Sequence, residues 1–459
     1  MKEKKIINSL ITTIFVITII TSIFFTNLSK YSNSFIWGLA TIMILSSACY
    51  FTIKLKFSQL NIPKILLSLK SSSQTKETIN TLESLSMSLA AKIGVGSLAG
   101  VALAIYIGGP GSIFWMWVSS LLCAINTFSE SILGVIYKEK DYGKIYKGGP
   151  SYYIKKGLDN KYLALLYAII IIIAYIAGFL SIQSNTIVTI VNTITPINPL
   201  IIVIIIGILT ALVILKGVKQ IATFSSKIVP IMGLLYLALG LFIIINNLEG
   251  ILEILKKIIT DAFSLKSVQA GIIGTIIIGI QRGIFATESG LGTSAISSSA
   301  TNEDPIKQGY SQVLGIHFTT FIICTITALI ILTSNYQTLI LDDINGIEIT
   351  SFAFQNHLGK FGNLTLVIVT ILFAFTTIIS GYYYGEANLK FIFPKLKKKS
   401  LFLFKIITII IVVLGGIVHA TFLWNLVDLF VAFLSIINIY AILSLREKVI
   451  KEYQKHKKR

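Results

Sequence analysis

Long apolar runs alternate with short polar stretches along the whole chain. Each run holds roughly 20 residues, the length that an α-helix needs to cross the hydrocarbon core of a bilayer. The runs are rich in Ile, Leu and Phe and lack the strict alternation of a membrane β-barrel. The pattern therefore predicts an all-α membrane protein with about twelve transmembrane helices. We place them at about residues 7–25, 34–53, 83–107, 111–137, 161–182, 198–215, 225–246, 267–286, 310–333, 364–389, 400–420 and 422–444.

Composition and charge agree with this class and give an orientation. Of the 459 residues, 54% are hydrophobic and only 13% are charged, which is too few charges to cover a soluble protein. With the N-terminus inside, 30 Lys and Arg residues fall in inner stretches and 5 in outer ones. Because positive residues concentrate on the cytoplasmic side, we predict a multi-pass protein of the plasma (cell inner) membrane with both termini cytoplasmic. The first apolar run is followed by no Ala-x-Ala pattern, so we interpret it as an uncleaved helix.

The last ten predicted helices form a core that divides into two sets of five. Five is an odd number of crossings, so the two sets enter the membrane from opposite sides, as in the inverted repeats of transporters. The predicted divisions are 1–82 for two extra helices and a basic cytoplasmic loop, 83–246 and 247–444 for the two repeats, and 445–459 for a basic cytoplasmic tail. This plan predicts that the first helix of each repeat is broken near mid-membrane.

Both of those helices contain several glycines. Gly94, Gly96 and Gly100 lie in the stretch AAKIGVGSLAG, residues 90–100, and each lowers helix stability by about 1 kcal/mol relative to alanine. One interpretation is small-residue packing between helices. The other is an unwound segment whose N–H and C=O groups bind a substrate carboxylate and a cation. We favour the second, because Lys92 at this depth needs polar surroundings. The helix 267–286 contains Gly271, Gly274, Gly279 and Gly283.

Several blocks of sequence lie in the order found in a known family. They are GGPGSIFWMWVSSLL (108–122), YKGGPSYYIKKGL (146–158), RGIFATESGLGTSAISSSA (282–300) and FAFTTIISGYYYGEANL (373–389), with the weaker IQSNTI (182–187) and WNLVDLF (424–430). On these blocks the chain resembles the alanine-or-glycine:cation symporters, which have a leucine-transporter-like fold. The resemblance covers residues 34 to about 444. It implies uptake of a small neutral amino acid with Na⁺ or H⁺ as the coupling ion, no organic cofactor and no enzymatic activity.

The fold and the resemblance together suggest the site residues. For the substrate we predict Gly94, Val95, Gly96, Ser97, Gln183, Gly274 and Gly381. For the cation we predict Gly94, Val95, Thr376 and Thr377, because hard cations prefer oxygen ligands, with Lys92 as a substitute for a sodium ion. Two alternatives stay open: the threonine hydroxyls bond only to their own helix, and the amide of Gln183 bridges helices.

The glycine segment departs from the family pattern. Family members read close to ATVGTGNIAG where this chain has AKIGVGSLAG, and they have Gly-Trp where this chain has Ser380 and Gly381. The ammonium of Lys92 in a sodium site would make the carrier proton-coupled or uncoupled. The alternative is that Lys92 extends to the cytoplasmic face. A non-transporting sensor with the same fold is a second function compatible with these departures.

Four other charged residues lie in or beside the predicted helices. We predict a gate salt bridge between Arg282 and Glu288, with an ordinary interfacial pair as the alternative. Glu130 is either structural or the partner of Lys92, and Asp428 needs a partner that the sequence does not identify. The GGPG and GGP turns lack the Lys-Ser/Thr of a phosphate-binding loop, and the cysteines show no metal-binding spacing. We therefore predict secondary transport with no metal cofactor.

Overall fold

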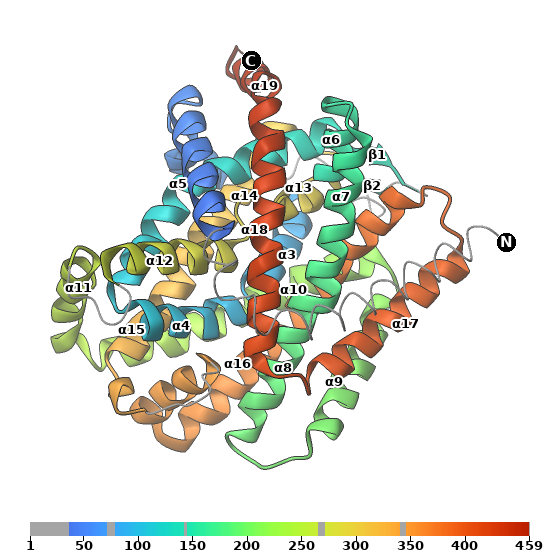
Figure 1. Ribbon diagram of the computed structural model, residues 1–459. Coiled ribbons are helices and arrows are strands. Elements are labelled where there is room, and N and C mark those ends of the chain that lie inside the picture. The colour runs from blue at the N-terminus through green and yellow to red at the C-terminus, as the bar shows by residue number, and fades with distance from the viewer. Residues whose placement is uncertain (1–35, 71–78, 142–144, 265–270, 340–345, 459) are drawn as a thin grey trace.

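The computed structural model describes residues 36–70, 79–141, 145–264, 271–339 and 346–458. The predicted helix 7–25 lies outside these residues. The described chain is almost entirely helical, and its one β-hairpin pairs Glu139–Lys140 (β1) with Tyr146–Lys147 (β2). Figure 1 shows α18 in the middle of the molecule, with α19 extending from its upper end.

The helices follow the predicted order. Before the core lie the helix Ile36–Lys54, η1 (Ser58–Leu60) and α2 (Ile62–Leu67). The first half of the core holds α3 (Thr81–Lys92), η2 (Val95–Ser97), α4 (Ala99–Gly108), α5 (Gly111–Ile136), α6 (Pro150–Gly157), α7 (Lys161–Ile172), η3 (Ile173–Phe179), α8 (Leu180–Asn192), α9 (Pro199–Ile214) and α10 (Val218–Ile245). The second half holds α11 (Leu248–Ala262), α12 (Gly271–Thr287), α13 (Thr293–Ser299), α14 (Pro305–His317), η4 (Phe318–Cys324), α15 (Thr325–Leu332), η5 (Tyr336–Thr338), α16 (Gly346–Ile392), α17 (Lys398–Gly415) and α18 (Ala420–Ser444). Helix α19 (Arg446–Lys458) follows the core.

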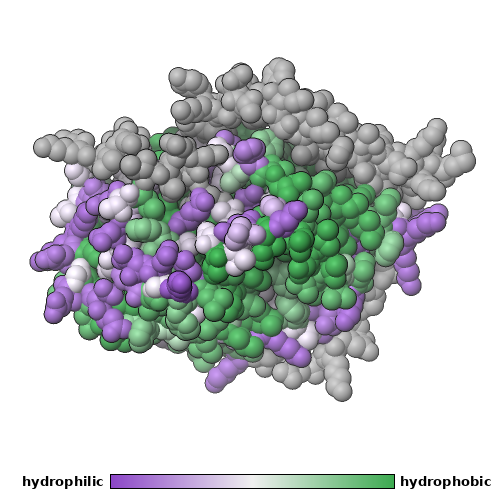
Figure 2. Space-filling view, turned by 90° about the horizontal axis from the view of Figure 1, so that it is seen from below, coloured by the Kyte–Doolittle hydropathy of each residue, from purple (hydrophilic) through white to green (hydrophobic). Residues whose placement is uncertain are grey.

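Seven described helices are long and apolar enough to cross a membrane, or eight when the bent pair α3–α4 is counted as one span. The other predicted spans within the described residues correspond to the shorter helices α9, α12 and α17. Large apolar side chains are exposed along α9, including Leu200, Ile204 and Ile208. Seen from below, one part of the surface is hydrophilic and another is a broad hydrophobic area (Figure 2). An apolar surface of this kind suits contact with lipid, and we conclude that the chain is a multi-pass membrane protein.

The first core helix is broken where the sequence predicted. It begins in a capping box, because Asn80 accepts from the backbone N–H of Glu83 at 2.8 Å while a Glu83 carboxylate oxygen accepts from the backbone N–H of Asn80. The helix stops after Lys92 and resumes at Val95, and the two pieces are bent by 59°. Gly94 and the short 3₁₀ turn that follows it interrupt the regular ladder of helical hydrogen bonds there.

The second broken helix is interrupted at a different place from the one predicted. Helix α12 runs unbroken through its glycines, and the break covers residues 288–292 before α13 begins. A Cβ atom at Gly279 would lie 2.4 Å from the carbonyl oxygen of Ser112, and one at Gly283 would lie 2.7 Å from the hydroxyl of Ser119. These glycines therefore allow close packing of α12 against α5. The prediction of a break between Gly271 and Gly283 was wrong.

The long polar stretch 334–363 contains a further helix. It begins at Gly346 and ends at a sharp kink at Gly359, where φ is 59° and ψ is −144°. The left-handed φ suits glycine, which has no Cβ atom to clash there. The chain then continues as the spanning part of α16, which brings Thr377 against Gly94 of the first helix break.

Candidate functional site

The break between α3 and α4 is held by a side chain from α8 and by a hydrogen bond within the break. The backbone N–H of Val95 donates to the amide oxygen of Gln183 on α8 at 3.0 Å, and the hydroxyl of Ser97 donates to the carbonyl of Gly94 at 2.8 Å. All of these residues are buried. Gln183 thus bridges two helices, and it does so at one of the peptide groups that the break releases from the helical ladder.

Two of the break glycines are needed because other side chains lie directly against them. A Cβ atom at Gly94 would lie 2.4 Å from the hydroxyl oxygen of Thr377, and one at Gly96 would lie 2.8 Å from the ring of Phe285. Neither contact leaves room for a methyl group. The break is therefore packed between α16 on one side and the end of α12 on the other.

The two predicted cation-binding threonines face different neighbours. The hydroxyl of Thr377 lies 2.8 Å from the carbonyl oxygen of Ala90 on α3, so it adjoins the break. The hydroxyl of Thr376 lies 3.0 Å from the carbonyl of Phe373 and 3.5 Å from the sulfur of Met232 on α10. The structure thus brings Thr377, but not Thr376, to the backbone of the first break.

Lys92 is buried inside the protein. Its side chain is 1% exposed, and its ammonium donates to the hydroxyls of Ser88 and, at 2.9 Å, of Ser294 on α13. It does not extend to the surface. It also makes no direct pair with Glu130, whose hydrogen bonds go elsewhere. The ammonium lies between α3 and α13, whereas Thr377 approaches α3 from α16.

The second break is held in the same way as the first. Its N–H at Gly292 donates to a carboxylate oxygen of Glu130 at 3.1 Å, its carbonyl at Gly290 accepts from Asn438 at 2.9 Å, and its carbonyl at Leu291 accepts from the hydroxyl of Tyr167 at 2.6 Å. Buried side chains from α5, α18 and α7 thus satisfy peptide groups that no helix satisfies. This gives Glu130 a structural role.

Glu288 lies at the start of this break in a strained conformation. Its φ is 54°, which is uncommon for a residue with a side chain. Its two carboxylate oxygens accept from the hydroxyls of Tyr175, at 2.6 Å, and Thr293, at 2.9 Å. Residues held in such conformations cluster at functional sites, and Glu288 is buried here.

The predicted ion pair between Arg282 and Glu288 is not formed. Arg282 instead donates to Asp428 on α18 at 2.6 Å, and both side chains are buried. The guanidinium also lies 5.0 Å from the ring of Trp424 and 5.9 Å from that of Phe285. The ion pair with Arg282 gives Asp428 the partner that the sequence did not identify. Arg282 and Glu288 are both buried, so neither lies at a membrane interface.

The remaining predicted substrate residues separate into two groups. Gly381 lies against Leu180, which is on α8 with Gln183, and against Tyr175, which donates to Glu288. It therefore adjoins residues that contact both breaks. Gly274 lies within α12, next to Thr275, whose hydroxyl donates to the carbonyl of Gly108 at the far end of α4. The structure does not bring Gly274 to either break, so Gly274 lies outside the candidate site.

Some residues at the site were not predicted from the sequence. Phe285 covers Gly96 and stacks on Phe179 with ring centroids 5.1 Å apart. Tyr175, Tyr167 and Asn438 bind the second break. Phe285 lies in the block RGIFATESGLG. The glycines and the glutamate of this block were the features of the sequence that could have indicated a helix break there.

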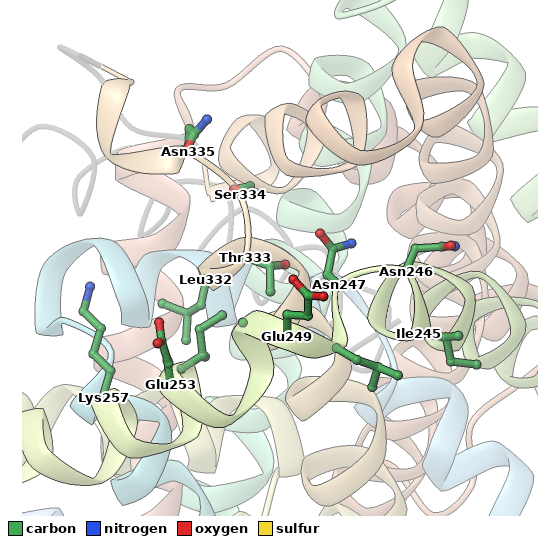
Figure 3. A pocket seen from close by; sticks show the side chains of 13 residues that line it. Ile245, Asn246, Asn247, Glu249, Glu253, Lys257, Leu332, Thr333, Ser334 and Asn335 are labelled. Atoms are coloured by element: carbon green, nitrogen blue, oxygen red, sulfur yellow. The ribbon is translucent and has the colours of Figure 1, made fainter.

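An open pocket lies elsewhere in the described part of the chain. It has a volume of about 830 Å³ and is lined by the ends of α10 and α15 and the start of α11, from Ile245 to Lys257 and from Leu332 to Asn335. Figure 3 shows Asn247, Glu249 and Thr333 close together in it. Its lining shares no residue with either break, so we assign the candidate site to the breaks and not to this pocket.

Comparison with known proteins decides the family. The sequence profile of the sodium:alanine symporter family matches residues 22–459. The chain belongs to this family. It is 34% identical to the probable sodium/glutamine symporter GlnT of Bacillus subtilis (strain 168), over 93% of this chain and 90% of that protein. It is 35% identical to the amino-acid carrier protein AlsT of the same organism, over 95% and 93%.

A solved structure supports the fold. The chain resembles a Na⁺-coupled sialic acid symporter in a substrate-bound outward-open state, with a TM-score of 0.51 and 12% identity, over 88% of this chain and 81% of that one. The leucine-transporter-like architecture is therefore confirmed. Membership of the family indicates cation-coupled amino-acid symport, and its named members are carriers and not enzymes.

Proposed function

We propose that this protein takes up a small neutral amino acid, of the alanine or glycine class, together with sodium across the plasma membrane, with both termini cytoplasmic. The observation that carries the proposal is the broken helix α3–α4, whose freed peptide groups meet Gln183, Thr377 and Phe285. Peptide groups at a helix break bind charged solutes without themselves carrying a charge. A zwitterion offers both a carboxylate and an ammonium to such a site.

When the substrate binds, its carboxylate replaces the amide oxygen of Gln183 as the hydrogen-bond acceptor of the Val95 N–H. That hydrogen bond is already formed within the protein at 3.0 Å, and an ionised acceptor makes a stronger one. The amide of Gln183 then turns to the substrate, and the backbone carbonyls and the hydroxyl of Ser97 receive the ammonium. Phe285, against Gly96, limits the room for the substrate side chain, which supports a small amino acid.

The cation binds beside the same break. Thr377 supplies a hydroxyl oxygen, and the carbonyls of the segment that contains Gly94 and Val95 supply others. Oxygen ligands of this kind suit sodium, which like calcium is a hard cation. Occupancy of the cation site and of the substrate site then stabilises one arrangement of the break, so each ligand raises the affinity for the other by the same factor.

We expect Thr377→Ala to weaken the dependence of uptake on sodium, because the substitution removes an oxygen next to the break. The sodium concentration for half-maximal uptake should rise at least about tenfold, equivalent to about 1.4 kcal/mol. Thr376→Ala is the matched control, since its hydroxyl faces Met232, and it should leave the sodium dependence unchanged. Uptake measured against sodium concentration in both variants checks this. Equal curves for Thr377→Ala and the wild type would contradict the proposed cation site.

Two ion pairs close the site on its two sides. Arg282 and Asp428 join α12 to α18 next to Phe285, and we assign this pair to the outer side because Asp428 lies near the predicted outer end of the last span. Both carboxylate oxygens of Glu83 lie 2.8 Å from the ammonium of Lys219, which joins the start of α3 to α10. Opening one pair while the other stays closed gives alternating access.

Accumulation in proteoliposomes tests the function. Purified protein is reconstituted, an inward sodium gradient is imposed, and uptake of labelled alanine, glycine and glutamine is followed. We expect alanine or glycine to accumulate above the equilibrium level and to stop doing so when the gradient is dissipated. Binding of an amino acid without accumulation would contradict transport and indicate a sensor.

A further inference from the structure

The charges around the second break do not balance. Lys92, Glu130 and Glu288 are all buried, with 1% of their surface exposed or less, and they act on one another electrostatically. Arg282 forms its ion pair with Asp428. Among the described residues, one cation therefore interacts with two carboxylates, and this leaves one surplus negative charge in the interior of the protein. A buried charge without a counter-charge is costly, so this group of residues favours taking up a proton.

The two carboxylates are bonded differently. Both oxygens of Glu288 accept from hydroxyls, those of Tyr175 and Thr293. In Glu130 one oxygen accepts from the N–H of Gly292 and from the amide of Asn438 at 2.8 Å. The other oxygen, Oε1, is buried and has no hydrogen-bond partner among the described residues. Hydrogen bonds to both oxygens stabilise an ionised carboxylate, and Glu288 has them, so Oε1 of Glu130 is the oxygen that is left to hold a proton.

We propose that Glu130 carries the proton that neutralises this surplus charge, and that the proton moves with the amino acid. The inference rests on the proposed function and adds a proton to its coupling. In the closed arrangement Oε1 holds the proton as a carboxylic acid. When α3 and α13 separate toward the cytoplasm, water reaches Oε1, the O–H bond breaks and the proton passes to that water. The carboxylate is reprotonated from water on the outer side, so one proton crosses inward in each cycle and no redox change occurs.

The groups that face Glu130 come from several helices. They are the ammonium of Lys92 on α3, the carboxylate of Glu288 between α12 and α13, and the hydroxyls of Tyr153 on α6 and Tyr167 on α7. Asn438 on α18 is a polar neighbour that does not titrate. Gly292 and Asn438 donate hydrogen bonds to Oε2 of Glu130. A movement of the second break therefore changes the hydrogen bonds of this carboxyl group. Protonation and helix movement are coupled through that contact.

The test monitors pH inside proteoliposomes that contain equal sodium on both sides and a pH-sensitive dye in the lumen. When alanine is added outside, we expect the lumen of wild-type vesicles to acidify as alanine enters. Glu130→Gln keeps the shape and neutrality of the acid, so it should exchange labelled alanine but produce no acidification. Glu139→Gln is the matched control, because Glu139 pairs with Lys156 near the surface, and it should acidify like the wild type.

The outcomes separate this inference from the proposed function. Alanine entry into wild-type vesicles without acidification would contradict proton coupling and leave sodium symport intact. Acidification by Glu130→Gln equal to that of the wild type also overturns it. Failure of the wild type to move any amino acid under any gradient would instead overturn the proposed function. If Glu130→Gln does not fold, Asn438→Leu serves: losing a donor to the carboxylate should shift the pH for half-maximal uptake upward, and an unchanged pH profile would contradict the proposal.

Discussion

Gly94→Ala is expected to reduce amino-acid uptake to the level of protein-free liposomes. The added methyl group would lie 2.4 Å from the hydroxyl oxygen of Thr377 and 3.1 Å from the amide oxygen of Gln183. Both atoms belong to the proposed site, so the clash displaces a cation ligand and a substrate contact together. Displacement of positioned groups by about 1 Å has large effects, on the order of 100-fold in rate for enzymes. Uptake of labelled alanine at saturating sodium measures the loss.

Gly100→Ala is the control for this substitution. It lies on the same helix pair, and a Cβ atom there would have only ordinary contacts of 3.9 Å with Phe285 and Trp424. We expect uptake by Gly100→Ala to stay within about twofold of the wild type, because no group has to move to admit a methyl at ordinary contact distance. Melting temperatures of both variants exclude a general folding defect. Equal uptake by the two variants would show that the first break does not hold the substrate.

Asp428→Asn is expected to destabilise the protein strongly. It leaves the guanidinium of Arg282 buried without its counter-charge, and removal of one partner of a buried ion pair typically costs about 3–5 kcal/mol. The melting temperature in detergent should fall accordingly. Uptake should also fall, because the pair fixes α12, and with it Phe285, against α18.

A double substitution separates stability from gating. In Arg282→Met with Asp428→Leu both charges are removed, and replacement of a buried pair by apolar side chains is often neutral or stabilising. We expect the melting temperature to recover while uptake stays low, because two apolar side chains favour the closed contact. Recovery of uptake together with stability would mean that the pair has only a structural role.

The first break was predictable because its signals are local. Three glycines and Lys92 lie within nine residues of one apolar run, and both facts argue against an uninterrupted helix in lipid. The second break was misplaced because glycine has two uses in membrane helices. Gly279 and Gly283 admit the neighbouring helix α5, whereas Gly290 and Gly292 adopt left-handed φ values of 80° and 94° at the true break. Sequence does not distinguish close packing from a positive φ.

The ion pairs illustrate a different limit. Arg282 and Glu288 are six positions apart, and residues at that spacing do not face each other on a helix, where neighbours are three or four apart. The true partner of Arg282 lies 146 residues away on α18. The sequence identified Lys92 and Glu130 as charges in need of partners, but the alternative that Lys92 reaches the cytoplasmic face was wrong. Their hydrogen bonds to Ser294 and Gly292 depend on where α13 lies. The division of the core at residue 246 and the orientation of the termini stay predictions.

Protection of a thiol at the first break tests the central claim most directly. Ser97→Cys is introduced after Cys49, Cys123 and Cys324 are replaced by serine, and its rate of modification is measured with and without the amino acid that the protein accumulates, in sodium. Binding at the break predicts that the amino acid slows modification at least about tenfold, to a degree that tracks its occupancy. A rate unchanged at saturating amino acid would place the substrate elsewhere and contradict the account.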